Sequence, residues 1–404
     1  MFMNPTLLFP SHPWPFALTF SAFMLLGVIR AGGAPAESKP LPGVDQLPTI
    51  KELPNPFVFS DGSPVKTPAD WRRRREELKT LFLYYEYGRP APDPGNVKGQ
   101  EQAAGKDGAT GAETRQILLT MGPSEKISTT LFITIPPGKG PFPTIVKGDL
   151  CWGRVAPEIV GQIIGRGYAL VEFDRTNIAP DDKTRDKGVL AAFPDADQGD
   201  LAAWAWGYAR VNDYLLTQHF VDKGKLIATG HSRGGKAALL AGALDERIAL
   251  TVPNGSGAGG AGCYRVQPPK TEDLKAIVTH FPNWFGPRFA GFIGHVDQLP
   301  FDQHEVRALV APRALLDTEG EGDIWANAHG TQQSYLAAKE VYKFLGAPDK
   351  TGIHFRPGKH EQNEQDFAAL LDFADHVLLG KPAKQDFNKV PFPEDPKAFE
   401  WTAP

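Results

Sequence analysis

The segment that most constrains the fold is KLIATGHSRGGKAALLAGAL, residues 225–244. It begins with a short apolar run ending at Thr229, passes a serine flanked by glycines, and continues with the alanines and leucines of a helix. A Gly-X-Ser-X-Gly turn between a strand and a helix exposes its serine on a strained corner, and the glycines leave room for that corner. The segment therefore predicts that Ser232 is a nucleophile. The alternative is an ordinary helix cap.

The rest of the chain alternates between strand-like and helix-like segments. Connections of crossover length join short Val, Ile and Leu runs flanked by Gly and Pro, which favours a mostly parallel sheet with helices on both faces. We therefore predict an α/β fold, a three-layer sandwich, with clear helices at 200–218 and 361–379. The strand-like runs are 116–121, 129–135, 143–148, 168–173, 225–229, 247–252, 313–317 and 351–356.

Three flanking segments carry separate predictions. After a Pro-rich stretch, Thr67 is placed to cap a helix that runs to about Glu86. In this helix the run Arg72–Arg75 is followed by acidic residues, so we interpret it as a solvent-exposed helix face. Residues 94–114 are predicted to be a loop, and the Pro-rich tail from Lys381 is predicted to lack regular structure.

The N-terminus has the pattern of a targeting segment. An apolar run, Phe16–Val28, is followed by small residues up to Ala36, so we expect residues 1–36 to be a signal peptide and residues 37–404 to form a single catalytic domain. No Lys or Arg precedes the apolar run, and an uncleaved anchor is the alternative. The expected location is secreted or periplasmic, with no membrane contact in the mature form.

Overall composition excludes several classes. A net charge of -4 gives no general attraction to nucleic acid, and we expect no nucleic-acid partner. Two cysteines, Cys151 and Cys263, are too few for a disulfide scaffold or a thiolate zinc site, and buried free thiols are expected. We expect a monomer.

A serine hydroxyl needs a base, and in this fold the base lies on the loop after the last strand. His360 has that position, because the strand TGIHFR and the turn PGK precede it and a helix follows. His231 is adjacent to the nucleophile, and neighbouring side chains on such a turn point apart. We therefore interpret His231 as a packing or gating residue.

The third group of such a site is a carboxylate on the loop after the penultimate strand, where it holds the histidine tautomer. The segment EGEGDIWANAHG follows RALLDT there and offers Glu319, Glu321 and Asp323. Each of them satisfies the chain order serine, acid, histidine.

Two competing motifs are rejected. GSGAGG, residues 255–260, has the GxGxxG spacing of a dinucleotide site, but prolines follow it and no helix begins there. His360 and Glu361 do not start an HExxH pair, because position 364 is glutamate. We expect neither a cofactor nor a metal.

Several segments in order resemble the glucuronoyl esterases, carbohydrate esterase family 15, and their bacterial relatives, from about Trp71 to Leu379. The segments are YYEYGRPAP, AAWAWGYARVNDYL, GHSRGGKAALLAGALDERIAL, SGAGGAGCYR, FPNWF, LPFDQH, APRALL, GDIWANAHG and RPGKH. The resemblance implies an α/β-hydrolase fold, no metal or cofactor, and hydrolysis of esters between 4-O-methylglucuronic acid on xylan and lignin alcohols.

The resemblance also implies roles for individual residues. It makes Ser232 the nucleophile, His360 the base and Arg233 a group that supports the oxyanion. Lys236, Glu272 and Trp325 match positions that contact the uronate; for Lys236 the alternative is a solvent-facing helix residue.

Two segments depart from the family pattern. Many members carry the catalytic acid as a glutamate where this chain has Gly255, which raises Asp323, in a segment resembling DxWA(D/N), above Glu319 as the acid. The loop KGDLCWGR, residues 147–154, replaces an Asn-His element and leaves Asp149 and Trp152 unexplained. The alternatives are an acetyl xylan esterase or other polysaccharide acyl esterase, a non-catalytic sugar-binding pseudoenzyme and, less favoured, a related peptidase.

Overall fold

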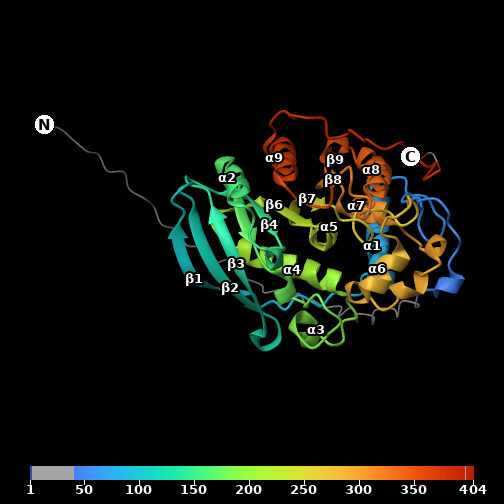
Figure 1. Ribbon diagram of the computed structural model, residues 1–404, viewed down its shortest axis with the longest axis horizontal. Helices are drawn as coiled ribbons and strands as arrows, with labels where there is room; N and C mark the ends of the chain where they lie inside the picture. Colours follow the sequence, from blue (N-terminus) through green and yellow to red (C-terminus); the bar gives the residue numbers. More distant parts are fainter. Residues whose placement is uncertain (2–40, 396) are drawn as a thin grey trace, which may run out of the picture. The chain divides into compact units, whose positions relative to one another are not determined.

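The computed structural model describes Met1, residues 41–395 and residues 397–404. Apart from Met1, the predicted signal peptide lies outside the described residues. The described residues form a nine-stranded sheet in the order β1-β2-β3-β5-β4-β6-β7-β8-β9 (Figure 1). Its strands are β1 Lys98–Lys106, β2 Glu113–Met121, β3 Ile127–Ile135, β4 Phe142–Lys147, β5 Ala169–Glu172, β6 Val221–His231, β7 Ile248–Asn254, β8 Ala314–Gly320 and β9 Thr351–Arg356.

The sheet is mostly parallel, as predicted. From β5 through β4, β6, β7 and β8 to β9 all neighbours are parallel, whereas the pairs β1–β2, β2–β3 and β3–β5 are antiparallel. Each predicted strand corresponds to one of β2–β9. Because the carboxyl ends of the parallel strands share one edge, the loops after β4, β6, β7, β8 and β9 meet there.

Helices cover both faces of the sheet. Helix α2 (Pro157–Gly165) and helix α9 (Glu364–Leu379) bury Ile163, Leu370 and Phe373 against strand residues such as Ile227 and Leu316. On the other face α4 (Asp200–Leu215) packs against α5 (Arg233–Leu244) and α5 against α7 (Gln303–Val310). The remaining helices are α1 Pro68–Tyr85, α3 Gly188–Ala192, α6 Leu274–His280 and α8 Ala328–Phe344. No helix among the described residues is long and apolar enough to span a membrane.

Helix α1 begins as predicted but two of its arginines do not face solvent. The Thr67 hydroxyl accepts a hydrogen bond from the Asp70 N–H at 3.1 Å, the expected N-terminal cap. Arg74 and Arg75 are buried, and Arg75 donates to the carbonyls of Leu309 and Ala243. The prediction of an exposed face is therefore wrong for these two side chains, because α1 packs against α7.

The predicted loop at 94–114 is also wrong in part, because it contains β1. Every residue of β1 is exposed, so the strand has no alternation of buried and exposed side chains that a sequence pattern could reveal. Backbone pairing with β2 holds it at the edge of the sheet. The described part of the tail after Lys381 has no helix or strand, as predicted. Both cysteines are free thiols, but only Cys263 is buried; the prediction of burial is wrong for Cys151, which is half-buried.

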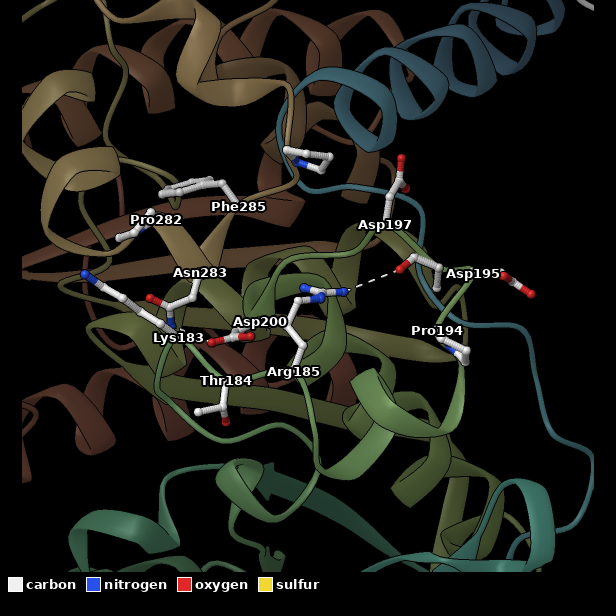
Figure 2. Close-up of a pocket in the computed structure, with 12 residues that line it drawn as sticks. Lys183, Thr184, Arg185, Pro194, Asp195, Asp197, Asp200, Pro282, Asn283 and Phe285 are labelled. Carbon is white, nitrogen blue, oxygen red and sulfur yellow. Dashed lines mark hydrogen bonds between the residues drawn. The ribbon is translucent and has the colours of Figure 1, made fainter.

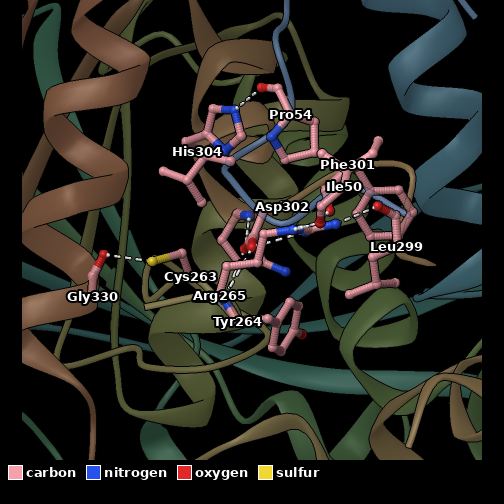
Figure 3. A network of polar contacts seen from close by, with 12 residues as sticks. Ile50, Pro54, Cys263, Tyr264, Arg265, Leu299, Phe301, Asp302, His304 and Gly330 are labelled. Atoms are coloured by element: carbon pink, nitrogen blue, oxygen red, sulfur yellow. Dashed lines mark hydrogen bonds and ion pairs between the residues drawn. The ribbon is translucent and has the colours of Figure 1, made fainter. Parts of the chain in front are cut away.

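A polar network fastens the glycine-rich loop after β7 to the N-terminal extension (Figure 3). The Asp302 carboxylate accepts hydrogen bonds from the backbone N–H of Tyr264 at 2.8 Å and of Arg265 at 3.2 Å. The Arg265 guanidinium donates to the carbonyl of Ile50 at 3.0 Å. Because these groups are buried or half-buried, their hydrogen bonds hold the loop in one position.

Candidate active site

Ser232 lies on the strained turn that the sequence predicts. Its backbone has φ 54 and ψ -122, a conformation rare for residues other than glycine, and its N–H donates to the Asn254 carbonyl at 2.9 Å. A Cβ on Gly230 would lie 2.3 Å from the carbonyl oxygen of Gly234, and one on Gly234 would lie 1.8 Å from Asp149 Oδ1. Only glycine fits at these two positions.

The structure brings Ser232, His360 and Asp323 together from three loops. His360 Nε2 lies 2.8 Å from Ser232 Oγ, and His360 Nδ1 lies 2.6 Å from Asp323 Oδ2. The Asp323 side chain is buried, and its Oδ1 accepts the Ala326 N–H at 3.2 Å. This arrangement matches a nucleophile, a base and an acid that orients the base.

Gly255 explains how Asp323 reaches the histidine. A Cβ on Gly255 would lie 3.4 Å from Asp323 Oδ2 and 3.5 Å from His360 Nδ1. The Asp323 carboxylate thus lies beside Gly255, the position where the resemblance implies a glutamate in many members of the family. Glu319 lies within β8 and is fully buried; burial and then the charge of Asp323 raise its pKa well above the usual range.

Asp149, which the sequence leaves unexplained, binds the backbone of the turn that carries Ser232. Its Oδ2 accepts the His231 N–H at 2.8 Å, its Oδ1 accepts Arg175 at 2.6 Å, and Lys147 also donates to it. Burial raises the pKa of Asp149, but the charges of Lys147 and Arg175 together hold it below the usual value. Asp149 therefore binds the residue before Ser232 as an anion.

His231 is held away from the serine by β7. Pairing of β6 with β7 sets His231 opposite Asn254, and His231 Nδ1 lies 2.6 Å from Asn254 Oδ1. Burial, with the charge of His360 second, lowers the pKa of His231 to about 4. The ring is therefore neutral near pH 7, and its centroid lies 4.6 Å from that of His360.

Lys236 and Glu272 form a buried ion pair near the serine turn. Lys236 Nζ lies 2.9 Å from Glu272 Oε2 and also donates to the Ala258 carbonyl. The alternative of a solvent-facing lysine is wrong, because Lys236 is 3% exposed. Burial lowers the pKa of Lys236, against the opposing charge of Glu272. Trp325, whose carbonyl accepts the Glu272 N–H at 2.8 Å, keeps an exposed side chain.

Arg233 points its guanidinium toward a residue that sequence reasoning missed. Its Nη1 donates to Asp181 Oδ2 at 2.6 Å, and Asp181 Oδ1 accepts the Trp284 indole N–H at 2.9 Å. The guanidinium lies 4.6 Å from the centroid of the Trp284 ring. The position of Asp181 in the sequence could have indicated a site residue, because it lies on the long loop after β5, at the edge of the sheet that carries the nucleophile.

A cavity of about 500 Å³ at the start of α4 contains none of these residues (Figure 2). Two of its polar side chains are paired with each other, since Asn283 donates to Asp200 at 2.6 Å, and Arg185 donates to the Gln198 carbonyl at 3.0 Å. Among the described residues, His, Cys, Asp and Glu side chains do not gather in threes in a way that could hold a metal.

Known proteins resemble this chain in sequence and in fold. The family described as "Glucuronyl esterase, fungi" matches residues 120–346. Carbohydrate esterase MZ0003 from an unknown prokaryotic organism is 32% identical over 81% of this chain and 90% of its own length. The chain belongs to the glucuronyl esterase family. A 4-O-methyl-glucuronoyl methylesterase of Phanerochaete carnosa is 31% identical over 82% of each chain.

Solved structures of the family share the fold. The carbohydrate esterase family 15 glucuronoyl esterase from Caldicellulosiruptor kristjansonii superposes with a TM-score of 0.77 at 33% identity, over 89% of this chain and 99% of that one. The predicted α/β-hydrolase fold and the predicted family are confirmed. The chain is a carboxylic ester hydrolase of the glucuronyl esterase family.

Proposed function

We propose that this enzyme hydrolyses 4-O-methylglucuronoyl esters that link xylan to lignin alcohols, with Ser232, His360 and Asp323 as its catalytic residues. The observation that carries the proposal is the hydrogen-bonded series Asp323, His360, Ser232 beside the buried pair Lys236 and Glu272. The relatives named as 4-O-methyl-glucuronoyl methylesterases support the choice of 4-O-methylglucuronic acid as the acyl half of the substrate.

In the first step His360 Nε2 takes the proton of Ser232 Oγ, and the oxygen attacks the ester carbonyl. Asp323 accepts the Nδ1–H of His360, which fixes the tautomer and stabilises the imidazolium that forms. His360 then gives the proton to the leaving oxygen as the bond from the acyl carbon to the alcohol breaks. Water deprotonated by His360 attacks the acyl-enzyme, and the proton returns to Ser232 Oγ as the uronic acid leaves.

The oxyanion is stabilised from α5. The backbone N–H of Arg233, the residue after the nucleophile, lies in the first turn of this helix, where N–H groups have no partner within the helix. The Arg233 guanidinium, held by Asp181, adds a fixed positive charge nearby. The negative charge that develops on the oxyanion is therefore stabilised by donors of Arg233 that are already in position.

The uronate is recognised by Lys236, Glu272 and Trp325. An ammonium has three N–H groups, and Lys236 uses two of them for Glu272 and the Ala258 carbonyl. The third is left for a sugar hydroxyl. The exposed face of Trp325 suits the apolar face of a sugar ring.

The test compares two substrates. The enzyme should release benzyl alcohol from benzyl glucuronate much faster than it releases acetate from acetylated xylan. Faster release of acetate would make it an acetyl esterase. A protein that releases neither and is not labelled by a fluorophosphonate would be a sugar-binding pseudoenzyme.

We also propose that residues 1–36 direct export and that residues 37–404 act as a monomeric single domain, secreted or periplasmic. The support is the apolar run and the small residues that end at Ala36. Mass spectrometry of the exported protein should find an N-terminus near residue 37; an intact N-terminus on a membrane-bound protein would contradict the proposal.

A further inference from the structure

A second cavity, of about 450 Å³, opens beside the histidine of the catalytic series. His231 and His360 line one part of it, and the half-exposed Trp152 lines another. Apolar side chains of α2, of the segment before it and of α9 contribute to the lining, namely Val155, Ala156, Ile159 and Phe367. Polar and charged side chains line it as well, namely Lys147, Asp149, Arg154, Glu361 and Gln362. The cavity therefore has a lining of mixed polarity that includes both an apolar group and the proposed base His360.

The position of His360 decides which half of an ester this cavity faces. His360 Nε2 lies 2.8 Å from Ser232 Oγ and hands its proton to the leaving oxygen, so the alcohol must lie on the histidine side of the serine. Over the described residues, the lining includes none of Lys236, Glu272 and Trp325. This cavity is thus a surface separate from the proposed uronate residues.

Trp152 is a fixed aromatic surface within this cavity. Its ring centroid lies 4.4 Å from the guanidinium of Arg175, which is fully buried and bound to Asp149 at 2.6 Å. The ring also makes an edge contact with His231, with centroids 6.0 Å apart. Yet 51% of Trp152 is exposed, which is unusual for a side chain anchored in this way.

We propose that this cavity binds the leaving alcohol of the ester and that Trp152 selects arylalkyl alcohols by stacking on their ring. The inference rests on the proposed function and adds the site and the residue that choose the alcohol. A benzyl group whose oxygen lies at His360 Nε2 would enter a cavity whose lining includes Trp152, Val155 and Ile159. A methyl ester leaves this surface empty.

The experiment measures kcat/KM for benzyl and methyl glucuronate, and takes their ratio. Both esters have the same uronate, so changes in uronate binding and errors in enzyme concentration affect the two values equally and cancel in the ratio. Trp152→Ala should lower the benzyl-to-methyl ratio about 10-fold, the size expected for an aromatic contact and its burial. Trp152→Phe should keep most of the ratio, and Trp152→Leu, which keeps apolar bulk without a flat ring, should fall between them.

Trp325→Ala is the matched control, because it removes an exposed tryptophan from the uronate side. It should lower kcat/KM for both esters and leave their ratio within about 2-fold. If both esters are hydrolysed and Trp152→Ala keeps the native ratio while its melting temperature is native, the inference is overturned and the proposed function stands. If the native protein hydrolyses neither ester, both are overturned.

Discussion

The two sides of Ser232 differ in how they are built. The proposed acyl side, Lys236, Glu272 and Trp325, has a buried ion pair whose side chains are at most 5% exposed. The proposed alcohol side, the cavity lined by Trp152 and His360, is open and has both apolar and polar lining residues. A buried pair presents charge in one geometry, whereas an open aromatic surface accepts many shapes. If both proposals hold, the difference predicts that the uronate half of the substrate is specified more strictly than the shape of the alcohol half.

The largest expected effect concerns Ser232, because both proposed sides are defined by its role as the nucleophile. Ser232→Ala should lower kcat for benzyl glucuronate by about 10⁵-fold or more, as for other catalytic serines. The measurement is steady-state kinetics on a protein whose melting temperature is native. Activity near the native level would remove the nucleophile and with it both sides.

The next largest effect concerns the acid that orients His360. Asp323→Asn should lower kcat by about 10³ to 10⁴-fold, because the amide supports the wrong tautomer of the histidine. The matched control is Glu319→Gln, which replaces a buried carboxyl whose pKa burial raises well above its usual value. A large loss in Glu319→Gln with little loss in Asp323→Asn would reassign the acid.

Removing the buried cation sharpens the contrast between the two sides. Lys236→Met should lower kcat/KM about 100-fold for benzyl and methyl esters alike, because a charged donor to the sugar is lost. Stability should also fall by about 3–5 kcal/mol, since Glu272 is left buried and unpaired.

The double variant with Glu272→Gln removes that unpaired charge and should regain most of the stability without regaining activity. Unfolding curves and kinetics on both variants measure this. A change confined to one ester would contradict a purely acyl role for Lys236.

The smallest expected effect is a change of folding stability with pH that depends on His231, a residue that lines the cavity of the proposed alcohol side. The pKa of His231 is lowered from 6.5 to about 4, so between these values the unfolded chain binds a proton there and the folded chain does not. Stability contributed by neutral His231 is present above pH 6.5 and is lost as the pH falls to 4.

His231→Gln should remove about 1–3 kcal/mol of that acid-dependent loss, as judged from unfolding curves at the two pH values. The control is the same pair of measurements on Lys225→Gln, a half-exposed surface residue on β6. Equal acid sensitivity in the native protein and in His231→Gln would show that the ring titrates normally.

Local sequence patterns predicted the parts of the molecule whose signal lies within a few residues. The strand, turn and helix around Ser232, the strands β2–β9 and the place of His360 after the last strand are of this kind. Edge strand β1 could not be predicted, because its stability comes from backbone pairing and its side chains are all exposed.

Contacts between distant segments escaped sequence reasoning. Asp149 binds the N–H of His231 from 82 positions away, and Asp181 reaches Arg233 across 52 positions. A single sequence has no periodic signal for such pairs. Arg74, which bonds to Glu305 across 231 positions, was assigned to the surface for the same reason.

The most direct test is a crystal structure of Ser232→Ala with benzyl glucuronate bound. We expect the ester carbonyl beside position 232, a sugar hydroxyl within hydrogen-bond distance of Lys236 Nζ, and the benzyl ring stacked on Trp152. A sugar bound in the Trp152 cavity, with the benzyl ring against Trp325, would contradict it.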